Sequence, residues 1–188
     1  EHFGSPGAAL AAKAQDLEKA GLKPALARAI VGRDFFTDPQ KELARLDKAG
    51  AVVVALGSPQ YPPLLAQAPF PPPLLYLRGS LQGCREQAVA IVGSRAAGPY
   101  GLRMAREIAA ALARAGASVV SGLALGVDGA AHAAALAAGG HTVGVLGSGL
   151  DRPYPRDHLD LMRAMAQKGA VISEFPLGTD PARHHFPM

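Results

Sequence analysis

The chain has 188 residues, long enough for one large domain or for a medium and a small one, and its net charge is +4. Aromatic residues make up only 5% and Trp is absent, so we expect an aliphatic core. No stretch approaches the roughly 18 apolar residues of a membrane span and no secretory signal is visible, so we expect a soluble, cytoplasmic protein. The single cysteine, Cys84, excludes an intrachain disulfide and a multi-cysteine zinc site.

The N-terminal quarter is rich in helix-forming residues. Residues 1–7, EHFGSPG, resemble an expression remnant, and we set them aside. Residues 8–21 and 38–50 each favour a helix that ends at a glycine, and Asp38 followed by Pro39 is a favoured helix start. We predict a small helical N-terminal domain over residues 1–50.

A strand is predicted over residues 51–56, and a proline-rich segment follows it. Seven prolines between Gly57 and Gly79 exclude long regular structure there, and a linker is the default interpretation. The same segment is rich in leucine, however, and also carries Phe70 and Tyr76. We therefore predict an ordered segment packed on the next domain, with a short strand over residues 74–79.

From Ala88 onward, strands and helices alternate. Three strand–helix units and a closing strand predict an α/β fold with a parallel sheet and helices on both faces, within a domain of residues 51–188. Ligands of such sheets bind at the carboxyl ends of the strands. That rule points to four loops, over residues 93–100, 121–128, 147–155 and 173–187.

The first loop, GSRAAGPYG, is typical of anion binding without a catalytic group. It lacks the Lys of a phosphate P-loop and the glycine triplet of a dinucleotide site. Gly93 allows a sharp turn, Ser94 offers a hydroxyl and Arg95 a forked cation beside a helix N-terminus. A plain turn with a solvated arginine is an equal alternative. Positive charge is concentrated here, because Glu107 is the only acid among four arginines: Arg95, Arg103, Arg106 and Arg114.

The second loop offers backbone donors at Ser121, Gly122 and Gly126. Asp128 and His132 lie four residues apart, so a general-base dyad or a metal pair is one interpretation. We favour the other, a capped helix with a structural histidine, because no third ligand or nucleophile has a recognisable spacing.

The last two loops carry aromatic and cationic side chains, a combination that suits single-stranded nucleic acid. In the third loop, Tyr154 could stack on a base or pack against the sheet edge. The final stretch adds Arg183, His184 and Phe186 as candidate contacts, beside Phe175 and His185. We expect His184 and His185 to point apart in an extended segment, which argues against joint metal ligation.

Taken together, the motifs resemble the DNA-processing protein A (DprA, or Smf) family. The matching segments occur in family order and cover residues 61–187: YPPLLAQAPFPPPLLYLRG, AIVGSRAAGPYG, SGLALGVDGAAHAAAL, HTVGVLGSGLDRPYPRDH and ISEFPLGTDPARHHFP. The resemblance implies an extended Rossmann-like core that binds single-stranded DNA. It also implies RecA loading in natural transformation (competence), DNA recombination, and self-association into a homodimer, with no catalysis.

Carried over by position, the resemblance assigns the phosphate-binding turn to Gly93, Ser94 and Arg95. The S-G-x-A-x-G-x-D segment covers Ser121, Gly122, Gly126 and Asp128, and Phe186 matches the F-P that closes the DNA pocket. The family pattern continues with a basic R-N-R run that this chain lacks, since it stops at Met188, so we expect a fragment. No metal, cofactor or membrane partner is expected.

An enzyme acting on nucleoside monophosphates is the alternative, because phosphoribohydrolases of the LOG type also hold phosphate at a glycine turn. Those enzymes carry a P-G-G-x-G-T-x-x-E motif that is absent here, and Glu174 is the only acid near that strand end. A protein-interaction scaffold with a vestigial phosphate site is a third interpretation.

Overall fold

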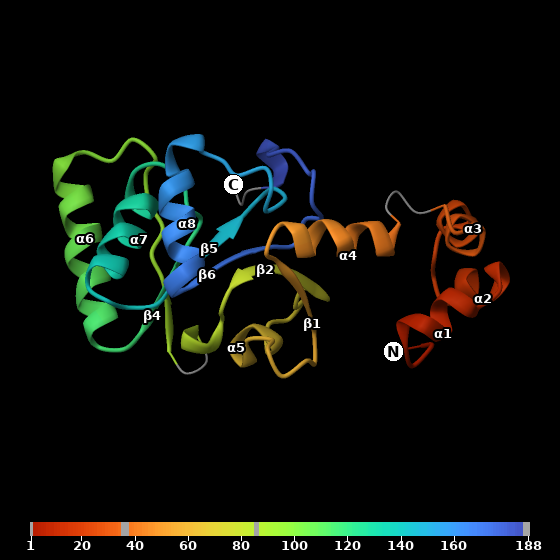
Figure 1. Cartoon of the computed structure of the whole chain (residues 1–188). Helices are drawn as coiled ribbons and strands as arrows, with labels where there is room; N and C mark the ends of the chain where they lie inside the picture. The colour runs from red at the N-terminus through yellow and green to blue at the C-terminus, as the bar shows by residue number, and fades with distance from the viewer. Residues whose placement is uncertain (1, 35–37, 85–86, 186–188) are drawn as a thin grey trace. The chain divides into compact units, whose positions relative to one another are not determined.

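The computed structural model describes residues 2–34, 38–84 and 87–185 (Figure 1). The chain divides into two compact units, Glu1–Glu42 and Leu43–Met188. Within the described ranges, no helix combines the length and apolar character that crossing a bilayer requires. The predicted domain of residues 1–50 stays a prediction.

The first unit consists of helices. It contains α1 (Pro6–Ala11), α2 (Ala14–Lys19), α3 (Pro24–Gly32) and the start of α4 (Pro39–Lys48). The single helix expected over residues 8–21 is broken between α1 and α2, and α1 begins at Pro6, inside the segment that we had set aside. Ser5 caps α1 by accepting the Ala8 N–H at 3.1 Å.

The second unit is built on a six-stranded mixed sheet in the order β1-β2-β6-β5-β4-β3. Strands β3 to β6 are mutually parallel, as predicted, whereas β1 and β2 run antiparallel at one edge. The strand bounds are β1 (Val52–Ala55), β2 (Leu74–Gly79), β3 (Ala88–Ala90), β4 (Ser118–Ser121), β5 (Thr142–Leu146) and β6 (Ala170–Ser173). The α/β, Rossmann-like class is therefore confirmed, with an antiparallel extension.

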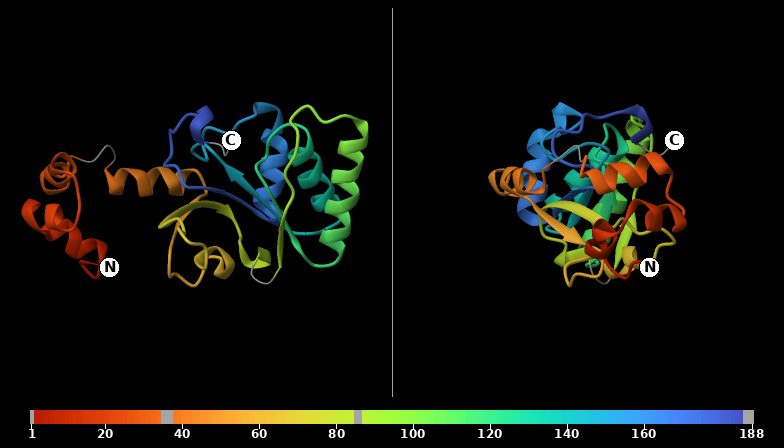
Figure 2. Two further views of the ribbon diagram at one scale, coloured as in Figure 1. Left: turned by 180° about the vertical axis from the view of Figure 1, so that it is seen from behind. Right: turned by 90° about the vertical axis from the view of Figure 1, so that its right-hand side faces the viewer.

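The helices cover the two faces of this sheet unequally. Helices α6 (Pro99–Arg114), α7 (Val127–Ala137) and α8 (Leu159–Lys168) lie side by side on one face (Figures 1 and 2). Strands β3 to β6 follow one another in chain order, so right-handed crossovers place all three helices on the same side. Among the described residues, only the short helices α5 (Pro63–Ala66) and η1 (Gln82–Cys84) pack on the other face.

Separate apolar clusters fill the two sides of the sheet. On the helical side, Leu46 of α4 packs with Leu123, Met165 and Val171. On the other side, the proline-rich segment is ordered, as predicted: Tyr61 and Leu65 pack against the strands, and the Tyr61 hydroxyl donates to the Pro72 carbonyl oxygen at 2.8 Å.

Part of the second face stays uncovered. We call the side of β3–β5 that faces away from α6–α8 the open face, formed by Ala90, Val92, Val120 and Val145. Val92 is 80% exposed, and an apolar cavity of about 400 Å³ lies against the same strands. Parallel strands are normally buried on both faces, so this surface is unusual for the fold.

Candidate functional site

The four loops chosen from the sequence meet in one cavity at the carboxyl ends of the strands. This cavity, which we call the loop pocket, has a volume of about 510 Å³. Every loop contributes to its lining, which includes Arg95, Gly122, Asp128, Gly147, Phe175 and His185. The rule that ligands bind at the carboxyl ends of parallel strands therefore located the cavity from sequence alone.

The first two loops are locked together by Gly126. The Val127 N–H donates to the Ser94 carbonyl oxygen at 3.2 Å. Gly126 has a φ of +80°, and a Cβ there would collide with the Ser94 carbonyl oxygen and lie 2.8 Å from that of Arg95. Only glycine permits this approach, so Gly126 positions the Ser94–Arg95 turn, while its predicted role as a backbone donor to a ligand stays a prediction.

Ser94 and Arg95 are both exposed, and Arg95 lines the loop pocket. The Ser94 hydroxyl oxygen accepts the Ala96 N–H at 3.1 Å, which leaves its proton available to a ligand. A second, small cavity of about 30 Å³ brings Arg95 together with Tyr154. Helix α6 begins nearby at Pro99, and its N-cap residue, Gly98, has no side chain that could cap the first amides. These donors suit an anion.

The other residues of these loops are mainly structural. A Cβ on Gly93 would lie 2.7 Å from a Val127 methyl group, so this glycine allows the loops to pack. Ser121 is 4% exposed, and its hydroxyl donates to the Ile91 carbonyl oxygen at 2.6 Å. The Ser121 hydroxyl proton is therefore engaged within the protein, while the residue itself lines the loop pocket, and its role as a backbone donor to a ligand stays a prediction.

Asp128 and His132 form no dyad. His132 donates from Nδ1 to the Thr142 hydroxyl oxygen at 2.7 Å, because that hydroxyl donates its own proton to the Val119 carbonyl oxygen. Asp128, in the first turn of α7, instead accepts the Ala124 N–H of the preceding loop at 3.3 Å. The structural role of His132 is therefore confirmed, whereas the predicted cap is wrong, because the N-cap residue of α7 is Gly126 and no side chain caps the helix.

Burial makes His132 a neutral residue. Its side chain is fully buried, which lowers its pKa from 6.5 to about 4. A backbone hydrogen bond to Ser121 offsets part of this shift, and the nearby His158 adds to it.

The final stretch folds back over the loop pocket as a short helix, η3 (Arg183–His185), and our expectation of an extended segment is wrong. The His184 and His185 rings meet edge to face, with centroids 4.4 Å apart. His185 donates from Nδ1 to the Gly147 carbonyl oxygen at 3.0 Å and stacks on Phe175, with centroids 4.1 Å apart.

The three candidate contacts from this stretch have different outcomes. Arg183 and His184 are exposed, and they do not line the loop pocket. Phe186 lies outside the described residues. The Phe175–His185 stack, which does line the loop pocket, was missed as a pair because local sequence carries no signal for the return of the chain.

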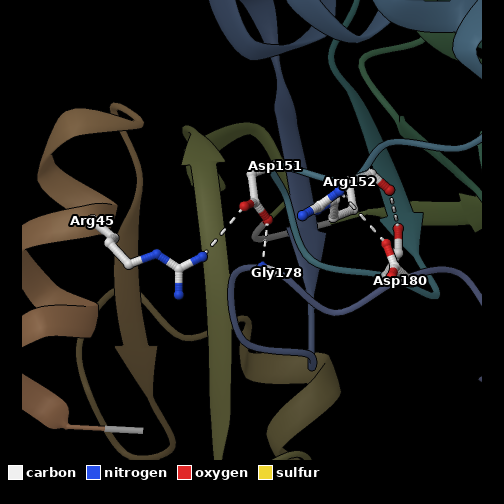
Figure 3. A network of polar contacts seen from close by, with 6 residues as sticks. Arg45, Asp151, Arg152, Gly178 and Asp180 are labelled. Carbon is white, nitrogen blue, oxygen red and sulfur yellow. Dashed lines mark hydrogen bonds and ion pairs between the residues drawn. The ribbon is translucent and has the colours of Figure 1, made fainter.

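A polar network holds the third and fourth loops in place (Figure 3). Asp151 accepts the Gly178 N–H at 2.7 Å and pairs with Arg45 of α4 at 3.4 Å. Beside it, Arg152 pairs with Asp180 at 3.8 Å. These contacts fix the backbone that carries Gly147 and Phe175 into the loop pocket. Within the described ranges, no group of three or more His, Cys, Asp or Glu side chains could hold a metal ion.

Comparison with known proteins identifies the family. The model of a family described as DNA recombination-mediator protein A matches residues 52–188. This chain belongs to that family. Among recombination-mediator relatives, protein Smf of Synechocystis is 38% identical over 162 residues, which cover 84% of this chain and 41% of the relative. The DNA processing protein DprA of Bacillus subtilis is 35% identical, and the match covers 82% of this chain and 52% of the relative.

Two solved structures of DNA processing protein A share the fold. DprA of Streptococcus pneumoniae superposes with a TM-score of 0.79 at 31% identity, covering 93% of this chain and 60% of that one. A unique single-stranded DNA binding mode is described for DNA processing protein A of Helicobacter pylori. Its structure superposes with a TM-score of 0.64 at 30% identity, and the match covers 72% of this chain and 60% of that one. The chain thus spans about half the length of the curated Smf and DprA relatives.

Proposed function

We propose that this chain binds single-stranded DNA at the loop pocket. The observation that carries the proposal is that Arg95 and the Phe175–His185 stack line one cavity, with the exposed Ser94 hydroxyl next to Arg95 in the chain. Such a combination suits a strand whose phosphates need donors and whose bases need a flat apolar surface. The Helicobacter pylori relative, which binds single-stranded DNA, supports this assignment.

We further propose the cellular role that the family suggests. The DNA-bound protein protects incoming single strands in the cytoplasm and loads RecA recombinase onto them during natural transformation, acting as a homodimer. Membership of a recombination-mediator family supports this role. RecA filament formation on single-stranded DNA, measured with and without the protein, tests it; an unchanged rate of RecA nucleation contradicts it.

Binding without catalysis is the function that the site chemistry favours. Glu174 is exposed at the edge of the loop pocket, and the Asp128–His132 dyad that could have acted as a general base is absent. Incubation with nucleoside monophosphates tests the enzymatic alternative. Release of free base that is lost in Glu174→Gln would establish a phosphoribohydrolase instead.

Arg95→Ala is expected to weaken binding of oligo-dT about tenfold or more, since a charge-assisted hydrogen bond contributes roughly 1.5–3 kcal/mol. The slope of log affinity against log salt is expected to shrink by about 0.7, the value for one phosphate on a single strand. Fluorescence anisotropy of labelled oligo-dT across a salt series measures both quantities.

Arg163→Ala is the matched control for this experiment. Arg163 is an exposed arginine of α8, paired with Asp160 at 2.9 Å, and it does not line the loop pocket. Its removal is expected to leave the affinity and the salt slope unchanged. Equal behaviour of the two variants would show that Arg95 holds no phosphate.

A further inference from the structure

We infer that Asp128 accepts a hydrogen bond from the Watson–Crick edge of an unpaired base and thereby makes the loop pocket select single strands over duplex. The inference rests on the proposed function and deepens it. It assigns a role to a carboxylate that was otherwise explained only as part of a helix start.

The carboxylate of Asp128 is incompletely satisfied. The residue is 4% exposed, and Oδ2 accepts the Ala124 N–H. Oδ1 is buried and has no hydrogen-bond partner among the described residues. An unpaired buried carboxylate oxygen carries a large desolvation penalty, so its persistence in a cavity wall points to a donor supplied from outside.

The loop pocket indicates which kind of donor that is. Asp128 lines the cavity together with a second carboxylate, Glu174, and with the Phe175–His185 stack. A phosphate deep in this cavity would meet two negative charges, whereas a base would find both a stacking surface and a hydrogen-bond acceptor. The exposed Ser94–Arg95 turn, whose Arg95 lines the loop pocket, is the better place for the phosphate.

Oδ1 is buried while the loop pocket is empty, so contact with a base requires a change in the Asp128 side-chain torsions that brings this oxygen to the cavity wall while Oδ2 keeps the Ala124 N–H. The backbone of Gly122 leaves space for this carboxylate, since a Cβ there would lie 3.0 Å from Oδ2.

A single acceptor at this position distinguishes unpaired from paired bases. All four bases carry at least one N–H on the Watson–Crick edge, so Asp128 can bind any of them. In a duplex these N–H groups are engaged by the complementary strand. The contact is therefore tolerant of sequence and sensitive to pairing.

The test uses oligo-dT and the same oligomer carrying N3-methylthymine, in which a methyl group replaces the only N–H of the base. The wild-type chain is expected to bind the methylated strand about tenfold more weakly, the loss of one charge-assisted hydrogen bond. Equal affinity of the wild-type chain for the two strands would overturn the inference.

Asp128→Asn separates hydrogen bonding from steric exclusion of the methyl group. The Ala124 N–H requires an oxygen, so the amide is expected to turn its NH₂ group toward the cavity. The affinity gap between the two strands is then expected to fall below about twofold, although the side chain keeps its size. A gap that persists in this variant would show that the methyl group only clashes, and the inference would be wrong.

Asp157→Asn is the control, since Asp157 is exposed in the short helix η2 (Arg156–His158) and does not line the loop pocket. It is expected to keep the wild-type gap between the two strands. The same measurements distinguish a failure of the proposed function from a failure of this inference alone. Absence of any binding to unmodified oligo-dT overturns the proposed function and this inference with it, whereas binding that ignores the methyl group overturns the inference alone.

Discussion

Gly126→Ala is expected to disrupt the loop pocket and to lower the free energy of unfolding by about 3 kcal/mol or more. Two penalties add. A side chain at the φ of +80° and ψ of −124° of Gly126 costs roughly 1–3 kcal/mol, because this backbone region is almost restricted to glycine, and forcing a methyl group against packed atoms costs about a further 1–3 kcal/mol. The atoms it meets are the backbone oxygens of Ser94 and Arg95, which cannot rotate away as a flexible side chain would.

This substitution is also expected to weaken DNA binding more than stability alone explains. Moving the Ser94 carbonyl oxygen breaks its bond from the Val127 N–H, and the Ser94–Arg95 turn loses its position beside α7. Urea unfolding measures the stability of the variant, and anisotropy with oligo-dT under conditions where it is still folded measures the affinity.

Gly116→Ala is the matched control for Gly126→Ala. Gly116 has a nearly identical φ of +82°, but a Cβ there meets nothing within 4 Å. It is expected to cost only the backbone penalty of about 1 kcal/mol and to leave DNA affinity unchanged. If both variants lose the same stability, the contact between the two loops contributes nothing measurable.

Lowering the pH from about 7 to 4 is expected to remove roughly 3 kcal/mol of stability through His132. Its pKa is about 4 in the folded chain and 6.5 in the unfolded chain, so the unfolded state binds the proton more tightly. The stabilisation is fully present above pH 6.5 and is lost as the pH falls toward 4. Each pH unit within that window is worth about 1.4 kcal/mol per proton.

Urea unfolding midpoints between pH 7.5 and 4.5 measure this dependence, and His132→Leu isolates it. Leucine is similar in size and does not titrate, so the variant is expected to lose the part of the acid sensitivity that belongs to His132. His184→Leu, at an exposed position, is the control, and its stability is expected to depend on pH as that of the wild type does. Parallel pH curves for the wild type and His132→Leu would contradict the assignment.

The sequence predicted the elements well and their spatial order less well. Periodicity and glycine stops located the strands and helices after Ala88, and the strand-end rule brought Arg95, Gly122 and Asp128 to one cavity. Strand order is not encoded in local pattern, so the antiparallel edge and the one-sided placement of α6–α8 were not foreseen.

Side-chain roles were the hardest part to predict. Serine in a loop can face a ligand or the backbone, and only the structure shows the Ser121 hydroxyl donating to Ile91 while Ser94 stays exposed. The contribution of His185 depends on η3 folding back to meet Gly147, a contact between residues 38 positions apart. Such long-range contacts leave no mark on the spacing of nearby residues.

The open face has a consequence for any measurement of oligomeric state. Among the described residues, β3 pairs with β4 alone, and Val92 projects almost fully exposed just beyond the strand. A free strand edge beside apolar side chains favours pairing between molecules as concentration rises. By mass alone, such adventitious pairs would look like the homodimer we propose. Val92→Lys adds charge at this edge and is expected to suppress nonspecific pairing. The oligomeric state should therefore be measured in this variant, where any remaining dimer reflects specific self-association.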